Sequence, residues 1–218
     1  ILVFIIALPT LILPSKATLI CGKILAHIII FLLRFVLGVK VTFLGTENLR
    51  KNKRFFVASA HQSLLETFIL QAPLKYPVFI LKKELLRIPL FGWYLKKIGS
   101  ISINRNKISK KNLGLIDKIK ASIKKTSRPL IIFPQATRVL PSERISFKKG
   151  VGRIYNELGI KCQPVAINSG YVWPKKGLKN SHRTITVSIL KPISAKFSKD
   201  DFIKILEKNI YSELDLLN

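Results

Sequence analysis

The feature that most restricts the fold is an alternation of short apolar runs with amphipathic stretches after residue 39. Runs of strand length cover residues 39–44, 55–60, 78–81, 100–104, 129–133, 163–168 and 184–190. Helix-like stretches cover residues 64–71, 91–98, 110–125, 150–158 and 200–216. Strands that alternate with helices predict an α/β domain with a mostly parallel central sheet flanked by helices.

The first 39 residues are almost continuously apolar. Residues 17–39 are long enough to span a bilayer, which needs about 20 residues. One stripe of the helix would carry the basic side chains, namely Lys16 just before this run and Lys23, His27 and Arg34 within it. Such a stripe is typical of a helix at the membrane interface or in a hairpin. A signal peptide is disfavoured because the segment has no small-residue cleavage site.

We therefore expect two parts: a two-helix membrane motif over residues 1–39 and one α/β domain over residues 40–218. The sequence contains no Met, even at position 1, so we also expect that residues precede Ile1.

The chain is strongly basic, with 38 Lys and Arg against 11 Asp and Glu and a net charge of +27. Such a charge can attract nucleic acid, an anionic membrane or acidic soluble partners, and a compositional bias toward solvated lysines is the alternative explanation. No nucleic-acid-binding motif accompanies it, so we favour an anionic membrane and expect no nucleic acid. Two isolated Cys and three His form no metal-binding pattern, and we expect no metal, no cofactor and a cytoplasm-facing location.

The first candidate for chemistry is His61, which directly follows a buried-looking strand, together with Glu66 five residues later. On a continuous helix these side chains would point about 140° apart, so they meet only if His61 precedes the helix and folds back. The carboxylate would then orient the imidazole as a general base. The alternative is a capping box, in which Glu66 binds main-chain N–H groups at the helix start.

Two further segments carry cations and polar groups at strand ends. Arg105 follows a predicted strand and has the fork geometry that suits a phosphate. The apolar strand expected over residues 129–133 stops at Pro134, so Thr137 and Arg138 are expected in the loop that follows. Taken singly, the segment that ends at Arg105 is better explained by ordinary surface charge, and the segment that ends at Arg138 by a strand terminus. In a fourth segment, residues 163–174, Pro164 and Val165 are better explained by core packing than by a site, and lipid-interface positions stay open for Tyr171 and Trp173.

Together and in this order, the segments resemble the glycerolipid acyltransferase family, and most of all its bacterial 1-acyl-glycerol-3-phosphate acyltransferases. The four blocks run from His61 to Glu66, from Lys82 to Arg105, from Phe133 to Arg138, and over Pro164-Val165. The resemblance covers the chain from about residue 40 to its end and extends to the Asn-Ser-Gly-x-x-Trp-Pro sequence that begins at Asn168.

The resemblance implies a fatty acyl transfer from acyl-CoA or acyl-carrier protein to the sn-2 hydroxyl of a lysophosphatidic acid-like acceptor, giving phosphatidic acid. It implies that His61 is the base, that Glu66 orients it, and that Lys82, Arg105, Thr137 and Arg138 bind the acceptor. It also implies a place at the bacterial inner membrane, with the catalytic domain on the cytoplasmic face.

The third block departs from the family, because Gln135-Ala136 stands where Glu-Gly is usual. Gln135 can hydrogen-bond a glycerol hydroxyl but brings no negative charge, and we expect it to be a binding residue. Ala136 disfavours the positive φ that Gly would allow. Two alternatives therefore remain: an acyltransferase for another lysolipid or amino-lipid, and a catalytically silent relative that binds membranes.

Overall fold

Seven strands form one sheet in the computed structural model, which describes residues 7–50, 55–103, 113–126 and 128–217. They are β1 (Lys40–Leu44), β2 (Phe55–Ser59), β3 (Val78–Lys82), β4 (Ile101–Ile103), β5 (Leu130–Ile132), β6 (Lys161–Ile167) and β7 (Thr184–Ile189). Their order across the sheet is β1-β7-β6-β2-β5-β3-β4. All neighbours are parallel except β6 and β7, which confirms the predicted α/β fold with a mostly parallel sheet.

The strands that lead to the sequence motifs lie side by side at the centre of the sheet. β2 is buried from Phe56 to Ser59, as expected for a strand covered on both faces. It lies between β6 and β5, and β3 follows β5. These four strands are parallel, so their carboxyl ends reach the same edge of the sheet. The residues that emerge near this edge include His61, Lys82, Arg138 and Ser169.

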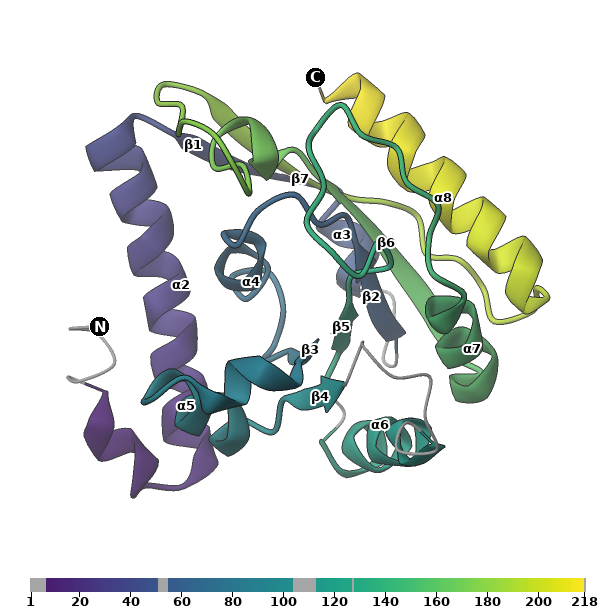
Figure 1. The fold of residues 1–218 in the computed structure, drawn as a ribbon, viewed down its shortest axis with the longest axis horizontal. Helices are drawn as coiled ribbons and strands as arrows, with labels where there is room; N and C mark the ends of the chain where they lie inside the picture. Colours follow the sequence, from purple (N-terminus) through teal and green to yellow (C-terminus); the bar gives the residue numbers. More distant parts are fainter. Residues whose placement is uncertain (1–6, 51–54, 104–112, 127, 218) are drawn as a thin grey trace.

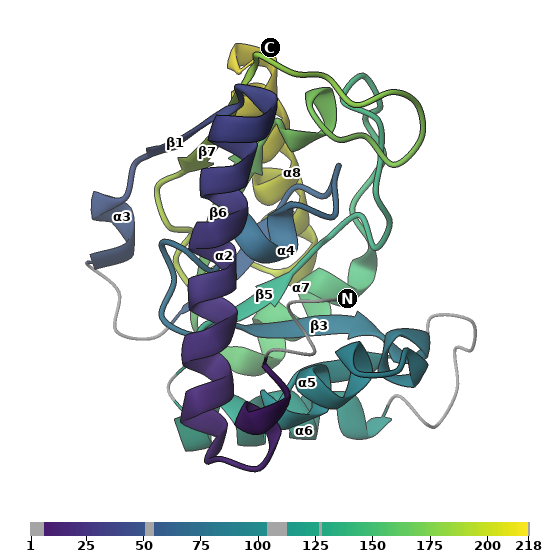
Figure 2. The ribbon, with the colours of Figure 1, turned by 90° about the vertical axis from the view of Figure 1, so that its left-hand side faces the viewer.

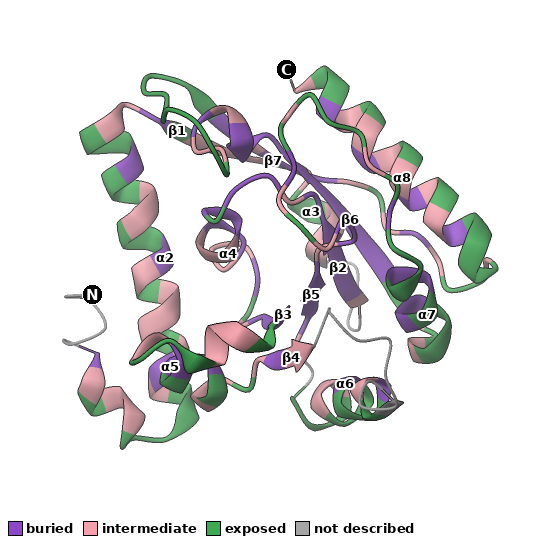
Figure 3. Cartoon of the chain, in the orientation of Figure 1, coloured by how far each residue is buried: buried purple, intermediate pink, exposed green. Residues whose placement is uncertain are grey.

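One face of the sheet is covered by α7 (Lys149–Leu158) and α8 (Lys199–Leu216), with α6 (Leu113–Thr126) beside α7 (Figure 1). The buried side chains of α8 recur every four residues and form a single stripe, made of Phe202, Leu206, Ile210 and Leu214. The rest of the helix is exposed or half-buried (Figure 3). Ser198 is the N-cap of the helix, and its hydroxyl accepts the N–H of Asp201.

The opposite face carries α2 (Ser15–Leu37), α4 (Glu66–Ile69) and α5 (Phe91–Lys97) (Figure 1). Figure 2 shows α2 running along almost the whole height of the molecule, in front of α4. It packs against α4 and α5, and a short helix, η1 (Leu8–Leu11), lies beside it. On this face α2 is therefore the outermost layer, packed over α4 and α5.

α2 turns an apolar surface away from the protein. Its buried residues are Thr18, Ala26 and Leu33. The exposed apolar side chains are Ile20, Ile24, Ile28, Phe31, Leu32, Phe35 and Val36. By length and composition the helix can cross a membrane. Of the expected pair of helices, the second is thus confirmed, whereas residues 7–14 hold only the short helix η1; the two-helix arrangement stays a prediction.

The other expected elements have bounds close to those observed, with one clear exception. The helix expected over residues 64–71 is shortened to α4. Its end is tightened because the N–H groups of Gln71 and Ala72 bond carbonyls three residues back, and Pro73 then blocks continuation. The short helices α3 (Glu47–Arg50), η2 (Lys83–Arg87) and η4 (Ser169–Tyr171) were not predicted.

Candidate active site

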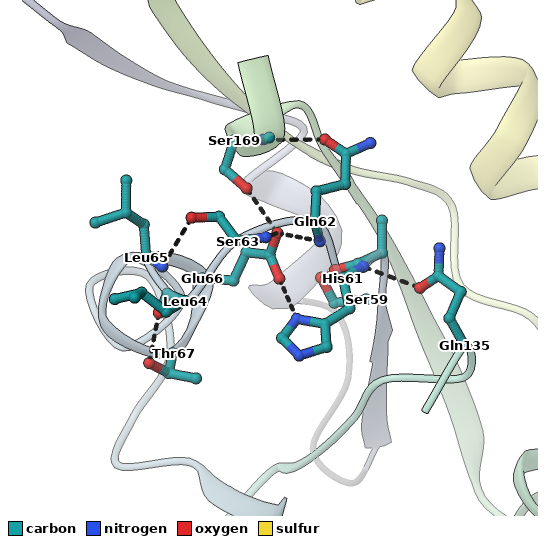
Figure 4. Close-up of polar contacts among 12 residues, drawn as sticks. Ser59, His61, Gln62, Ser63, Leu64, Leu65, Glu66, Thr67, Gln135 and Ser169 are labelled. Atoms are coloured by element: carbon teal, nitrogen blue, oxygen red, sulfur yellow. Dashed lines mark hydrogen bonds and ion pairs between the residues drawn. The ribbon is translucent and has the colours of Figure 1, made fainter. Parts of the chain in front are cut away.

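The side chains of His61 and Glu66 meet directly. His61 lies in the turn after β2 and folds back over the first residue of α4, so that its Nδ1 is 2.6 Å from Oε2 of Glu66 (Figure 4). An ionised carboxylate only accepts hydrogen bonds, so Nδ1 carries the hydrogen and Nε2 keeps its lone pair. The imidazole is therefore held in the tautomer that a general base requires.

Glu66 also closes the turn that carries His61. Its Oε1 accepts the main-chain N–H of Gln62 at 2.7 Å and that of Ser63 at 2.8 Å. The hydroxyl of Ser169 donates to the same oxygen at 2.6 Å. These donors compensate a carboxylate that is fully buried. Glu66 thus makes both contacts that the sequence offers as alternatives, main-chain N–H groups at Oε1 and the imidazole at Oε2, but these N–H groups belong to the turn before α4 and do not cap the helix.

The ring of His61 has one covered face and one accessible edge. Phe133 stacks on it with ring centroids 4.0 Å apart and planes inclined by 19°. The side chain is 15% exposed. Its Nε2 edge points away from Glu66 (Figure 4), and the residue lines an adjoining cavity. The imidazole is thus held by two neighbours, while one edge of it can be reached from the cavity.

The adjoining cavity is apolar and has a volume of about 290 Å³. It extends from His61 and Phe133, past β3 and α4, to residues of α2 and α5. The side chains on its α2 and α5 walls include Thr18, Cys21, Leu25, Tyr94 and Leu95. Burial raises the pKa of Tyr94, in keeping with a poorly hydrated wall. Such a space suits an aliphatic chain better than a polar ligand.

The loop after β5 is joined to the His61 turn by two hydrogen bonds. The N–H of His61 donates to Oε1 of Gln135 at 2.9 Å, and the N–H of Val139 donates to the carbonyl of His61 at 2.9 Å. Gln135 is fully buried, so its side chain serves here as a brace inside the protein. Ala136 adopts a φ of 59°, the left-handed conformation that Gly accepts without strain.

The expected phosphate-binding residues are only partly brought together. Thr137 is exposed, and Arg138 next to it is half-buried and precedes Val139, which bonds to His61. Lys82 ends β3, lines the same cavity as His61, and has its Nζ 3.5 Å from Oε1 of Glu84. Arg105 lies outside the described residues. Nζ of Lys175 reaches Oγ1 of Thr137 at 3.4 Å and adds a cation that was not predicted.

Three site residues were missed from the sequence, although each belongs to a recognised motif. Gln62 is next to His61, and Phe133 opens the third block two residues before Gln135, so the motifs themselves were the signal for both. Ser169 follows β6 and is 103 residues from Glu66. The Asn-Ser-Gly motif was the available signal for it, but only the pairing of β6 with β2 reveals why the hydroxyl matters. No cluster of metal-ligating side chains occurs in the part of the chain described.

Comparison with known proteins identifies the family of the chain. A family model described as Acyltransferase matches residues 40–168. The chain is 34% identical to a 1-acyl-sn-glycerol-3-phosphate acyltransferase of Pseudomonas aeruginosa over 73% of this chain and 62% of that protein. It is 33% identical to one of Saccharomyces cerevisiae over 81% of this chain and 59% of that protein. The chain thus spans about three fifths of the length of these curated relatives.

The fold is also that of a solved structure. The crystal structure of the 1-acyl-sn-glycerophosphate (LPA) acyltransferase PlsC from Thermotoga maritima aligns with a TM-score of 0.78, covering 93% of this chain and 80% of that chain. The sequence identity is 23%, so this likeness concerns the fold. Because the family model covers more than half of its residues, the chain belongs to the acyltransferase family.

Proposed function

We propose that the chain transfers a fatty acyl group from an acyl thioester to the sn-2 hydroxyl of 1-acyl-glycerol-3-phosphate, giving phosphatidic acid. The observation that carries the proposal is the His61 imidazole, held by Glu66 at 2.6 Å and lining a cavity fit for a hydrocarbon chain. The names of the relatives support lysophosphatidic acid as the acceptor.

In the proposed reaction, Nε2 of His61 takes the proton of the acceptor hydroxyl. The hydroxyl oxygen attacks the thioester carbonyl, the C–S bond breaks, and the thiolate leaves with the proton that the imidazolium returns. No covalent acyl-enzyme is needed. General-base catalysis of this kind contributes about 10²- to 10⁴-fold, and correct positioning of the two substrates contributes more.

We propose that Lys82, Arg105, Thr137 and Arg138 bind the acceptor phosphate. The hydrogen bond from Val139 to His61 supports this for the third block, because it keeps the loop that carries Thr137 and Arg138 against the base. Guanidinium and hydroxyl groups are suitable partners for a phosphate. The fit of Gln135 as a substrate ligand is weaker, since its amide oxygen already bonds the N–H of His61.

We propose that α2 holds the enzyme at an anionic membrane, with the catalytic domain on the cytoplasmic face of a bacterial inner membrane. The apolar outer face of α2 supports contact with acyl chains, and the net charge of +27 supports attraction to anionic headgroups. Because α2 has an apolar outer face and also lines the cavity, we propose that an acyl chain enters the site from the lipid along this helix. Acyl-CoA and acyl-carrier protein are both suitable donors, because both are anionic.

The test is a lysolipid acceptor screen with both thioester donors, scored by product mass, using wild type and His61→Ala. We expect wild type to acylate lysophosphatidic acid and His61→Ala to give no product above background. If neither protein turns over and both associate equally with anionic vesicles, the silent membrane-binding alternative replaces the proposal. Preference for a lysolipid without a phosphomonoester would instead support the alternative acceptor.

A further inference from the structure

We infer that Ser169 is a positioning residue for the proposed general base, acting through Glu66. The inference rests on the proposed function and deepens it. Ser169 is fully buried, and its hydroxyl donates to Oε1 of Glu66 at 2.6 Å. Figure 4 shows the carboxylate of Glu66 between this hydroxyl and the ring of His61. Ser169 therefore touches neither the imidazole nor the cavity next to it.

The Ser169 hydroxyl differs in origin from the other donors described around Glu66. The N–H groups of Gln62 and Ser63 belong to the same turn as the carboxylate and would move with it. Ser169 is in η4, after β6, and is 103 residues away in sequence. Its bond therefore ties the carboxylate to the sheet, whereas the two main-chain bonds tie it to its own turn.

A second hydrogen bond joins η4 to the turn that carries His61. The N–H of Gly170 donates to Oε1 of Gln62 at 3.1 Å, and Gln62 is also buried. The strands that precede these two segments, β2 and β6, pair in register up to Ser59 and Val165. The N–H of Ala60 also bonds the carbonyl of Val165. The start of η4 is thus held rigidly against the turn that carries His61.

The consequence concerns the two oxygens of the carboxylate. With Oε1 occupied by Ser169 and by two N–H groups, Oε2 is left to face Nδ1 of His61. Without the hydroxyl, the carboxylate can turn about its last bond and share Oε2 between the imidazole and its own turn. The ring would then spend less time in the reactive orientation. Catalysis should fall while substrate binding is kept, because the contacts with substrate are unchanged.

The matched control lies on the neighbouring strand. The hydroxyl of Ser188, on β7, donates to Oε1 of Glu213 at 2.6 Å, a bond of the same type and length whose serine is buried and whose carboxylate is half-buried. It joins the sheet to α8, on the face opposite the His61 site. Ser188→Ala thus removes an equivalent bond without touching Glu66.

The experiment compares kcat and KM of wild type, Ser169→Ala and Ser188→Ala with lysophosphatidic acid and an acyl thioester, alongside their thermal unfolding. We expect Ser169→Ala to lower kcat on the order of tenfold, as for loss of a hydrogen bond to a charged group, with both KM values within about twofold. Ser188→Ala should keep the wild-type kcat. A folded Ser169→Ala with wild-type kcat overturns the inference, and so does an equal loss in both variants.

A double variant separates positioning from general loosening of the site. If Ser169 acts through Glu66, then Ser169→Ala should cost less than about twofold in kcat when added to Glu66→Gln, because the oriented carboxylate is already gone. A further tenfold loss in that background contradicts the inference. If Ser169→Ala does not fold, Ser169→Cys, which keeps a weaker donor of similar size, should show a kcat below wild type; an unchanged kcat again overturns it. An inactive wild type would refute the proposed function instead.

Discussion

The main-chain N–H of His61 donates to the side-chain oxygen of Gln135 at 2.9 Å, so a residue from the loop after β5 sets the backbone position of the proposed base. Gln135 is fully buried and stands where the family usually has Glu. Either side chain offers an oxygen to this N–H. In this chain the oxygen of Gln135 thus bonds the turn that carries His61 and is not left free for a substrate.

The first prediction follows from this brace. Gln135→Ala leaves the N–H of His61 without its acceptor, which costs about 1–3 kcal/mol when such a group stays buried. We expect kcat for lysophosphatidic acid to fall about tenfold, together with a loss of stability in thermal unfolding. Gln135→Glu keeps an acceptor oxygen in place, and we expect a smaller loss of kcat. Equal losses in the two variants would contradict the assigned role.

The second prediction concerns the tautomer of His61. Glu66→Gln keeps an oxygen that can accept the N–H groups of Gln62 and Ser63, so the turn should persist. The amide can donate to Nδ1, which would favour the wrong tautomer. We expect kcat to fall by about 10²- to 10⁴-fold with a nearly unchanged KM for the acceptor. Steady-state kinetics checks this, and a loss confined to KM would refute the orienting role.

The third prediction concerns the strain at Ala136, which has a φ of 59°. A left-handed conformation costs a residue with a Cβ about 1–2 kcal/mol, and Gly loses part of this gain through the greater entropy of its unfolded chain. We expect Ala136→Gly to raise the free energy of unfolding by about 0.5–1 kcal/mol. Denaturant unfolding measures it. Ala121→Gly, at an exposed position inside α6, is the control and should lower the free energy of unfolding by about 1 kcal/mol, so a fall in both variants would contradict the prediction.

Most of the fold was predictable from the chain because its signals are local. The buried run of β2 and the four-residue spacing of apolar side chains in α8 each predict one element, with errors of about a residue at the ends. The sequence also set the condition for contact between His61 and Glu66: at a spacing of five residues they meet only if His61 precedes the helix, as it does. Parallel strands then bring the motifs to one edge of the sheet.

The rest depends on contacts that no local pattern records. Ser169 looks like a loop residue until β6 is placed beside β2, and only then does its hydroxyl reach Glu66. Gln135 was expected at the acceptor because of its polarity, but its oxygen is needed by a main-chain donor from a neighbouring loop. The shortening of α4 likewise reflects Pro73 and tightened hydrogen bonds that outweigh the apolar pattern of residues 64–71.

The fourth prediction tests the cavity as an acyl-chain site. Cys21 lines the cavity from α2, whereas Ile24, less than one turn further on, is exposed and does not line it. Cys21→Phe should fill part of the about 290 Å³ and shift the preference toward shorter acyl thioesters. Ile24→Phe should leave the preference unchanged. Competing thioesters of different chain length, scored by product mass, measure the shift; identical profiles for the two variants would exclude the cavity as the acyl site.

The last prediction concerns pH and the thiol of Cys162, which is fully buried at the start of β6. Burial raises its pKa well above the ordinary value, because the thiolate would lose its hydration. In the unfolded chain the thiol ionises near its usual pKa of about 8.5. The preference of the folded state for the neutral thiol therefore costs no stability below about pH 8.5. As the pH rises from there toward the pKa of the folded protein, ionisation of the unfolded chain lowers the free energy of unfolding.

Cys162→Ala removes this titration, although it leaves a small cavity and lowers stability at neutral pH. The free energy of unfolding of wild type should therefore fall toward that of Cys162→Ala as the pH rises above about 8.5, by up to about 1.4 kcal/mol per pH unit. Denaturant unfolding at pH 7.5, 9 and 10 measures the difference between the two proteins, which cancels the titration of shared Lys and Tyr residues. A difference that stays constant over this range would mean that the thiol ionises equally in both states, and hence that water reaches the start of β6 in the folded protein.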